Sequence, residues 1–553
     1  MSNISIPRSS SLRMYFRAKL TVYDLALAPT GRESKYGFCA TEFLPTCFSS
    51  LLARITAKCR RRRFLLATVE PTGRLMARAL SEVIDDLGVG WYHALVVLFC
   101  SGLMLADGAE MLMVSSIVGA LDGDLEAGKI TRGLLVSTSF LGMLLGNLLS
   151  GSVSGRYGRW CACMTSTVLL SFFGLLCSVI ETMFQLFVTQ FCLGLAIGVG
   201  GPASVTLLTE TAPTRSRGTV SNSASFAFTL GEAWTALGLL LFMPELKGPW
   251  RLLCIWGVLP ALLVAPFGLL VHESPSWLQL HERHHELRAL LASIRRMHGK
   301  DEVDILVQPM LSTSSSGTFK ILIQGEHCRT IGLGCTLAFV MNYLFFGTTF
   351  AFTQIFAEAE GDWTSPSMEM LVVAAAELGG IFLAWFLLWH PKIGRIAALR
   401  LLCVFSAIFS TCLISVVYGL FGIADPAAYG LKAMVSAMFP VLYLYVSEVL
   451  PVALRAKGVG FCMSLGRVGS VAAPALYAVG NHMVHSAGPF IASMVILSAA
   501  GYVAASHLVV ETCGRPLDTP CLEMTSCGRE AKSKEAKSRL RLKIGAGCFE
   551  VQE

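Results

Sequence analysis

The chain contains about twelve apolar runs, each roughly 20 residues long. They lie at residues 93-119, 131-152, 160-180, 183-207, 219-243, 251-271, 331-356, 368-389, 397-420, 427-447, 457-481 and 487-509. A helix of about 20 apolar residues is long enough to cross the hydrocarbon core of a bilayer. The runs therefore predict an all-α membrane protein with about twelve transmembrane helices, six before and six after a polar break.

Composition agrees with this fold class. Hydrophobic residues make up 54% of the 553 residues and charged residues only 15%, whereas soluble chains carry roughly 25% charged residues. The net charge of +7 is dispersed among loops, which favours anchoring to the cytosolic lipid surface over nucleic-acid binding. The 18 cysteines lack paired spacing, so we expect reduced thiols.

The two groups of six runs share short charged motifs in the same order. Glu210 to Arg217 and Glu448 to Arg455 both read Glu-x-x-Pro-x-x-x-Arg, and Gly158-Arg159 recurs as Gly394-Arg395. Such duplication in an apolar chain is typical of a transporter built from two similar helical halves.

Basic residues indicate the orientation of the helices. They fall in every second loop, and the loops between them are acidic or neutral. By the positive-inside rule both termini are cytosolic. The predicted parts are a cytosolic tail at 1-80, a six-helix half at 81-271, a cytosolic central loop at 272-330, a second six-helix half at 331-510 and a cytosolic tail at 511-553.

Five ionisable residues lie within the predicted spans. Asp107 and Glu110 are three residues apart in the first span, Glu232 lies in the fifth, Glu377 in the eighth and Arg467 in the eleventh. Each would cost roughly 2.5 to 3.5 kcal/mol in mid-membrane, so we expect them to face a shared interior cavity. Structural ion pairs between helices remain the alternative for each of them.

One metal-site pattern is set aside. His281-Glu282-Arg283-His284-His285 fits the H-E-x-x-H pattern of zinc peptidases. It lies in the central loop, where no surrounding domain supplies a third ligand, so a solvated helix face is the better interpretation. No metal, cofactor or catalytic constellation is predicted, and a membrane enzyme is the least favoured class.

Three motifs in order resemble the major facilitator superfamily over about residues 80-520. Gly151 to Arg159 is similar to that family's loop between helices two and three, although Gly155 replaces an acidic residue. Residues 272-278 match the signature after helix six, with His272 in place of proline, and residues 511-517 match the signature after helix twelve.

A narrower resemblance follows from residues 84-91 and 105-110, and from 342-349 and 376-380. They look like the branch that holds synaptic-vesicle-related proteins, nicotinate transporters and organic anion and cation transporters. In the organic anion carriers of that branch the position of Arg467 is basic, which favours an anionic substrate because a buried guanidinium can pair with a carboxylate. The four intramembrane acids keep a cationic substrate open.

The resemblance implies a proton-coupled secondary transporter of a small organic solute, leaning to a nicotinate-like carboxylate, that works by alternating access. We expect Arg467, Asn342, Tyr343, Glu232 and Glu377 to bind substrate, and Asp107 and Glu110 to take up protons. A gate is expected from Arg156, Arg159, Glu210, Arg217, Arg395, Glu448 and Arg455.

Two alternatives stay open beside this reading: an organic cation transporter or facilitator, and a transport-inactive vesicle membrane protein. The expected setting is a monomer in the lipid bilayer of the plasma membrane or of an intracellular vesicle.

Overall fold

The computed structural model describes residues 79–117, 129–243, 248–299, 325–358, 366–390, 392–418, 421–450, 452–484 and 488–513. The chain divides into residues 1–60 and residues 61–553, and every helix described below belongs to the second unit. Most of both predicted tails and the acidic loops near residues 122 and 360 lie outside the described residues.

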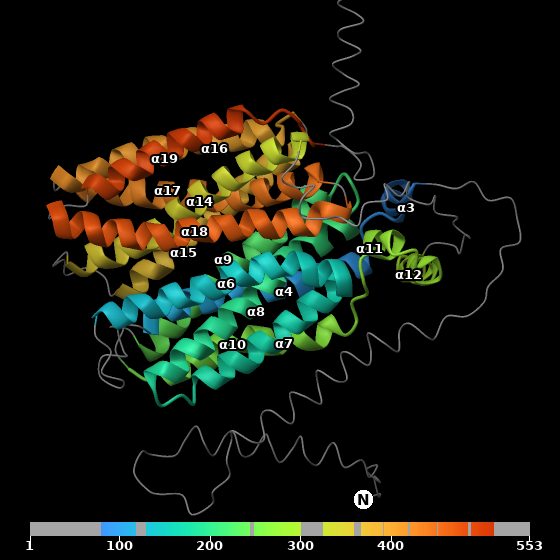
Figure 1. Cartoon of the computed structure of the whole chain (residues 1–553), viewed down its shortest axis with the longest axis horizontal. Coiled ribbons are helices and arrows are strands. Elements are labelled where there is room, and N and C mark those ends of the chain that lie inside the picture. Colours follow the sequence, from blue (N-terminus) through green and yellow to red (C-terminus); the bar gives the residue numbers. More distant parts are fainter. Residues whose placement is uncertain are drawn as a thin grey trace, which may run out of the picture. The chain divides into compact units, whose positions relative to one another are not determined.

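Twelve long helices among the described residues form two groups (Figure 1). The first group is α4 (Trp91–Ile117), α6 (Lys129–Tyr157), α7 (Arg159–Cys177), α8 (Met183–Thr211), α9 (Arg217–Phe242) and α10 (Trp250–Gly268). The second is α14 (Gly325–Glu358), α15 (Pro366–Trp389), α16 (Arg395–Cys412), α17 (Phe421–Val449), α18 (Val452–Val484) and α19 (Gly488–Ser506), with a 3-10 turn η1 (Leu413–Tyr418). The described part of the chain thus confirms the all-α fold in two six-helix halves.

Eleven of these helices, among the described residues, are long and apolar enough to cross a membrane. The remaining one is α18, which contains the predicted span 457-481 and has 33 residues. Its length suffices for a bilayer, but Arg467 and several glycines and serines lower its hydropathy. A helix that presents polar groups to neighbouring helices need not be apolar all round.

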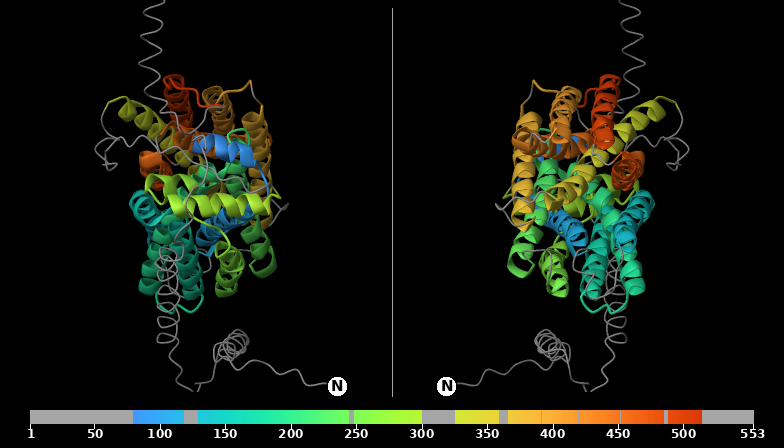
Figure 2. Two further views of the ribbon diagram at one scale, coloured as in Figure 1. Left: turned by 90° about the vertical axis from the view of Figure 1, so that its right-hand side faces the viewer. Right: turned by 90° about the vertical axis from the view of Figure 1, so that its left-hand side faces the viewer.

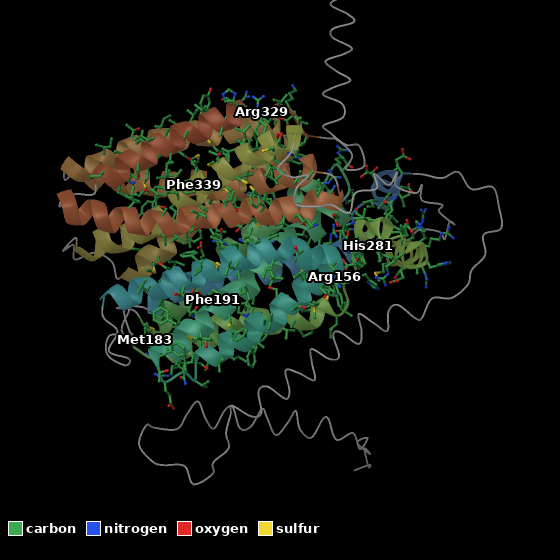
Figure 3. All side chains as sticks on the ribbon, viewed as in Figure 1. Arg156, Met183, Phe191, His281, Arg329 and Phe339 are labelled. Carbon is green, nitrogen blue, oxygen red and sulfur yellow. The ribbon has the colours of Figure 1, made fainter. Side chains whose placement is uncertain are left out.

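Three short helices lie at one end of the bundle, which we call the α11 end (Figure 2, left). They are α3 (Leu80–Leu87), α11 (Pro275–Leu280) and α12 (His284–Met297). The amphipathic α12 buries Leu287, Leu290, Leu291 and Ile294. Arg156 and His281 lie at this end and Met183 lies at the opposite end (Figure 3). The four helices α7 to α10 separate Arg156 from His281, whereas α7 alone separates Arg156 from Met183.

The two halves meet along α6 with α18 and along α9 with α15. Small residues allow the backbones to come close, because a Cβ added at Gly460 of α18 would lie 2.5 Å from the Asn147 carbonyl oxygen of α6. Between α9 and α15, the Asn222 amide donates to the Ile381 carbonyl at 3.2 Å, and the Trp385 indole donates to the Thr219 carbonyl at 3.2 Å. These contacts position both halves around a central cavity.

Candidate functional site

A cavity of about 100 Å³ lies between the two halves. Its wall comes from α4, α6, α8 and α9 of the first half and from α14, α15, α17 and α18 of the second. A cavity needs about 10–15 Å³ of such internal volume to hold one water molecule, so this one has room for several waters or for one small solute. A site shared by both halves is what alternating access requires, since its exposure changes when the halves move.

One acidic and one basic side chain, from opposite halves, line this cavity. Asp107 of α4 and Arg467 of α18 both line it, and they are close enough to interact electrostatically. Within the described part of the chain, Asp107 Oδ1 and Arg467 Nη1 are buried without a hydrogen-bond partner. The Arg467 guanidinium also lies 5.3 Å from the ring centroid of Phe346. Both charged groups therefore keep hydrogen-bonding capacity for a bound solute.

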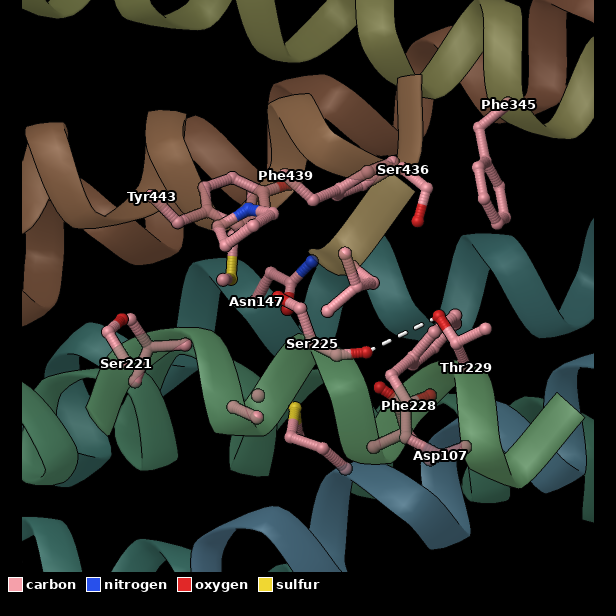
Figure 4. Close-up of a pocket in the computed structure, with 18 of the residues that line it drawn as sticks. Asp107, Asn147, Ser221, Ser225, Phe228, Thr229, Phe345, Ser436, Phe439 and Tyr443 are labelled. Atoms are coloured by element: carbon pink, nitrogen blue, oxygen red, sulfur yellow. Dashed lines mark hydrogen bonds between the residues drawn. The ribbon is translucent and has the colours of Figure 1, made fainter. Parts of the chain in front are cut away.

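The rest of the lining is aromatic with hydroxyl and amide groups between the rings. Figure 4 shows Phe345, Ser436, Phe439 and Tyr443 across the cavity from Asp107, Ser221, Ser225, Phe228 and Thr229, with Asn147 between them. Apolar walls with a few converging polar groups are typical of small-molecule sites. The arrangement suits a small solute that has both a flat apolar part and a charged group.

Glu110 does not line the cavity, contrary to the expectation of a shared site with Asp107. It is 0% exposed, and a Cβ added at Gly174 of α7 would lie 3.0 Å from its Oε1. Both its carboxyl oxygens are buried without a hydrogen-bond partner among the described residues. Because residues three apart differ by about 60° around a helix axis, Asp107 faces the other half while Glu110 faces the interior of its own half.

Asn342 and Tyr343 also lie outside the cavity lining. The Asn342 amide nitrogen donates to the Tyr443 hydroxyl at 3.5 Å, which places Asn342 directly behind a lining residue. The Tyr343 hydroxyl lies 2.6 Å from Ser493 Oγ of α19, on the side away from the other half. Successive helical residues point about 100° apart, so the α14 side chains that reach the cavity are Phe345 and Phe346.

Glu232 and Glu377 meet each other beside the cavity instead of lining it. Their carboxyl groups are within hydrogen-bonding reach of each other, and Lys432 Nζ of α17 lies 2.8 Å from Glu377 Oε1. The side chains of Lys432 and Glu377 are only 1% and 2% exposed. Sequence reasoning missed Lys432, although a lysine inside the apolar run 427-447 was a detectable signal.

Glu210 lies at the centre of a buried ion network at the α11 end. Its carboxylate is 3.1 Å from Arg159 Nε and 3.0 Å from Arg455 Nη1. Arg159 belongs to the same half and Arg455 to the other half. Ser274 Oγ also donates to the Glu210 carboxylate. A glutamate paired in this way links the two halves at this end.

Glu448 repeats the arrangement in the second half. Its carboxylate is 3.6 Å from Arg217 Nη1 of the first half and 3.5 Å from Arg395 Nε of its own half, and it accepts a hydrogen bond from Thr512 at 2.7 Å. Six of the seven predicted gate residues are therefore in these two ion clusters, which together we call the ion network at the α11 end. The exception is Arg156, which is exposed and packs over the Tyr157 ring at 5.6 Å.

Glu273, which lies in the matched motif at residues 272-278, supports the Glu210 cluster. Its carboxylate accepts from the backbone N–H groups of Arg159 at 2.7 Å and Trp160 at 3.1 Å, at the start of α7. Burial raises the pKa of Glu273, whereas these backbone N–H groups and the Arg159 charge oppose the shift. Gly158 has φ 107°, and a Cβ there would lie 2.0 Å from Glu273 Oε2. Glu511 makes the corresponding contacts at the start of α16.

Known proteins are similar to this chain in sequence and in fold. The family profile described as "Sugar (and other) transporter" matches residues 114–520. The niacin transporter NiaP of Acinetobacter baylyi is 27% identical, covering 79% of this chain and 98% of its own length. Organic cation/carnitine transporter 7 of Arabidopsis thaliana is 25% identical over 79% of this chain and 95% of its length. The 4-hydroxybenzoate transporter PcaK of Pseudomonas putida is 25% identical, covering 71% of this chain and 87% of its own length.

Among solved structures, the proton:xylose symporter XylE bound to 6-bromo-6-deoxy-D-glucose superposes with a TM-score of 0.68 at 18% identity, covering 78% of this chain and 99% of that one. That symporter is a member of the major facilitator superfamily. The fold, the two-half cavity and the family match agree with one another. The chain therefore belongs to the sugar (and other) transporter family, shares the fold of a major facilitator superfamily protein, and is a multi-pass membrane transporter of small organic solutes.

Proposed function

We propose that the protein is a proton-coupled transporter of a small organic carboxylate. The observation that carries this proposal is the Arg467 guanidinium, which lines the cavity with its buried Nη1 unsatisfied among the described residues. A buried guanidinium is a fixed pair of parallel donors, and a carboxylate is the anion that matches both. Leaving such a donor unpaired is unfavourable, so a bound carboxylate would stabilise this state.

The aromatic lining supports an aromatic or otherwise flat acid. Phe228, Phe345, Phe346, Phe439 and Tyr443 surround the cavity, and aromatic pairs are worth about 0.5–1.5 kcal/mol beyond simple burial. Two relatives are named for aromatic acids, niacin and 4-hydroxybenzoate. A nicotinate-like compound would place its ring among these side chains and its carboxylate on Arg467.

Charge balance gives a reason for proton coupling. Without a bound substrate, an Asp107 carboxylate would compensate the charge of Arg467, since both side chains line the same cavity. A substrate carboxylate that binds Arg467 would leave Asp107 as an excess buried negative charge, which is unfavourable unless Asp107 takes up a proton. Substrate and proton would therefore bind together. Glu110, one turn away and buried, is the second proposed proton acceptor in α4.

The ion network at the α11 end would act as the gate of alternating access. In the structure Glu210–Arg455 and Glu448–Arg217 hold the two halves together there, so the cavity is closed on that side. We place this end in the cytosol, because the basic loops lie on it. Transport would require these pairs to break and the opposite side to close.

An organic cation is the second candidate substrate. The observation that favours it is Asp107 Oδ1, a buried acceptor in the cavity that has no partner among the described residues. A relative named organic cation/carnitine transporter 7 shares 25% identity with the chain. In this case Asp107 would meet the substrate, and Arg467 would serve as a structural counter-charge.

Ligand binding to purified protein tests the choice between the two. Nicotinate should bind with affinity that falls from wild type to Arg467→Lys and further to Arg467→Ala, by roughly 1.5 to 3 kcal/mol for each charged hydrogen bond lost. Arg400→Ala is the matched control, because Arg400 bonds the carbonyls of Ala505 and Ser506 outside the cavity. If the wild type binds a quaternary amine and binds none of the carboxylates, the cation proposal replaces the anion proposal. Absence of uptake of either class in proteoliposomes would favour a transport-inactive vesicle protein.

A further inference from the structure

A buried group of two acids and one base joins the two halves beside the cavity. Glu232 comes from α9 of the first half, whereas Glu377 of α15 and Lys432 of α17 come from the second. Their exposed fractions are 8%, 2% and 1%. None of the three lines the central cavity, and the transport scheme above makes no use of them.

The hydrogen-bonding capacities in this group do not balance without a proton. Lys432 Nζ donates to Glu377 Oε1 at 2.8 Å, but Oε2 of Glu377 and Oε2 of Glu232 are both buried with no donor among the described residues. The two carboxyl groups are nevertheless within hydrogen-bonding reach of each other. An ionised carboxyl group only accepts, so two of them can share a hydrogen bond only if one carries a proton.

Charge leads to the same result. Two carboxylates and one ammonium would leave one uncompensated negative charge in a site shielded from water, and that is strongly unfavourable. The other titratable group acting on Glu232 is Asp107 of α4, which is also acidic. The elements packed against Glu232 and Glu377 therefore supply only Lys432 as a positive charge among the residues that the structure describes.

We propose that Glu232 and Glu377 share one proton across the contact between the halves, and that this proton holds α9 against α15. The contact it completes begins at the α11 end with Trp385 and Thr219 and continues through Asn222 and Ile381. Loss of the proton would place two like charges face to face across the interface. The proton therefore stabilises the state in which the α11 end is closed.

The site is connected to the cavity without being part of it. Lys432 Nζ lies 3.5 Å from the centroid of the Phe345 ring, which lines the cavity. Ser436, one turn further along α17, also lines the cavity and donates to the backbone carbonyl of Glu377 at 3.3 Å. A solute that moves Phe345 or Ser436 would thus act on the pair that holds the proton.

Infrared spectroscopy of the purified protein tests the shared proton directly. Wild type should show the carbonyl stretch of a protonated carboxyl group, and this band should disappear on titration to high pH. The high-pH minus low-pH difference spectrum of Glu232→Gln should lack this band. Lys432→Met should gain a second protonated carboxyl signal, since the charge that kept Glu377 ionised is removed. Glu181→Gln, at an exposed acid in the turn before α8, is the matched control and should change nothing. A spectrum unchanged by both Glu232→Gln and Lys432→Met would overturn the proposal.

Distance measurements test whether the proton holds the halves together. Spin labels at the exposed positions Arg215 and Lys392, on opposite halves at the α11 end, are best carried on unnatural amino acids because the chain has 18 cysteines. Raising the pH should add a longer-distance population in wild type. In Glu232→Gln the amide donates to Glu377 without titrating, so the short distance should persist at every pH. A pH-dependent distance that persists in Glu232→Gln would show that the shared proton does not hold the halves together. The proposal that Arg467 binds a carboxylate would not be affected by that result.

Discussion

Asp107 and Glu110 occupy neighbouring turns of α4 but have different surroundings. Asp107 lines the cavity together with Arg467. Glu110 lies among α4, α7 and α10, where a Cβ added at Gly174 or Gly257 would come within 4 Å of its carboxyl group. At the residue scale, the two acids are expected to differ in their link to the substrate.

Substitution of these acids should separate proton coupling from substrate passage. We expect Asp107→Asn to abolish concentrative uptake driven by a pH gradient, because the neutral amide cannot exchange a proton, while exchange of substrate across the membrane persists. Glu110→Gln should also reduce coupling, but it should change substrate affinity less than Asp107→Asn does, since Glu110 is outside the cavity. Uptake into proteoliposomes with and without an imposed pH gradient measures both. Wild-type uptake that ignores the gradient would disprove the coupling role.

At the scale of elements, the joint between α6 and α7 depends on one glycine. Gly158 has a φ of 107°, which side-chain-bearing residues rarely adopt, and the space beside it is filled by the Glu273 carboxylate. That carboxylate satisfies the first backbone N–H groups of α7, which have no partner within the helix. In the second half the close contact recurs between Gly394 and Glu511, although Gly394 has an ordinary φ of −73°.

Gly158→Ala should therefore destabilise the protein. We expect a loss of about 1–2 kcal/mol from backbone strain, with more from displacement of Glu273, seen as a lower Tm of the purified protein. Gly155→Ala is the control three residues earlier, because a Cβ there has no other atom within 4 Å and alanine favours the helix. Equal Tm values for the two variants would contradict this account of the joint.

At the scale of the whole molecule, the ion network at the α11 end joins the two halves. Each glutamate pairs with one arginine of its own half and one of the other. Removal of one partner of a buried ion pair costs about 3–5 kcal/mol. That loss would fall on the state that is closed at the α11 end and would change the populations of the two states.

Arg217→Ala and Arg455→Ala should each slow transport while substrate affinity stays within a few-fold of wild type. Both arginines act on the population of states and lie outside the cavity lining. Arg156→Ala is the control, since Arg156 is exposed and outside the network. Transport rates of both gate variants equal to wild type would show that the network serves only insertion or folding.

The orientation of the molecule can be tested with tags. Tags at residue 1, within 300-320 and at residue 553 should report the cytosolic side, and a tag near 360 should report the opposite side, because positively charged loops stay on the cytosolic side. Protease accessibility in sealed vesicles gives the readout. A tag at 300-320 found outside the cell or in the vesicle lumen would reverse the assignment of the gate to the cytosol.

The sequence by itself determined the number of membrane helices, the duplication and the identity of most intramembrane charges. These depend on the length of apolar runs and on residue types, which are local properties. It also singled out Glu210, Arg217, Glu448 and Arg455, which stand in a repeated motif and form the buried ion pairs between the halves. Lys432 was overlooked, although its charge in an apolar run was visible.

Only the tertiary structure decided which of these groups meet. It put Arg467 with Asp107 in the cavity, turned Glu110 and Tyr343 away from it, and brought Glu232 and Glu377 together with Lys432. The rotation of each helix about its axis, and the neighbours it packs against, determine where a side chain points. Spacing within one helix carries no information about partners on another helix, and so the pairs that join the two halves could not be derived from the sequence.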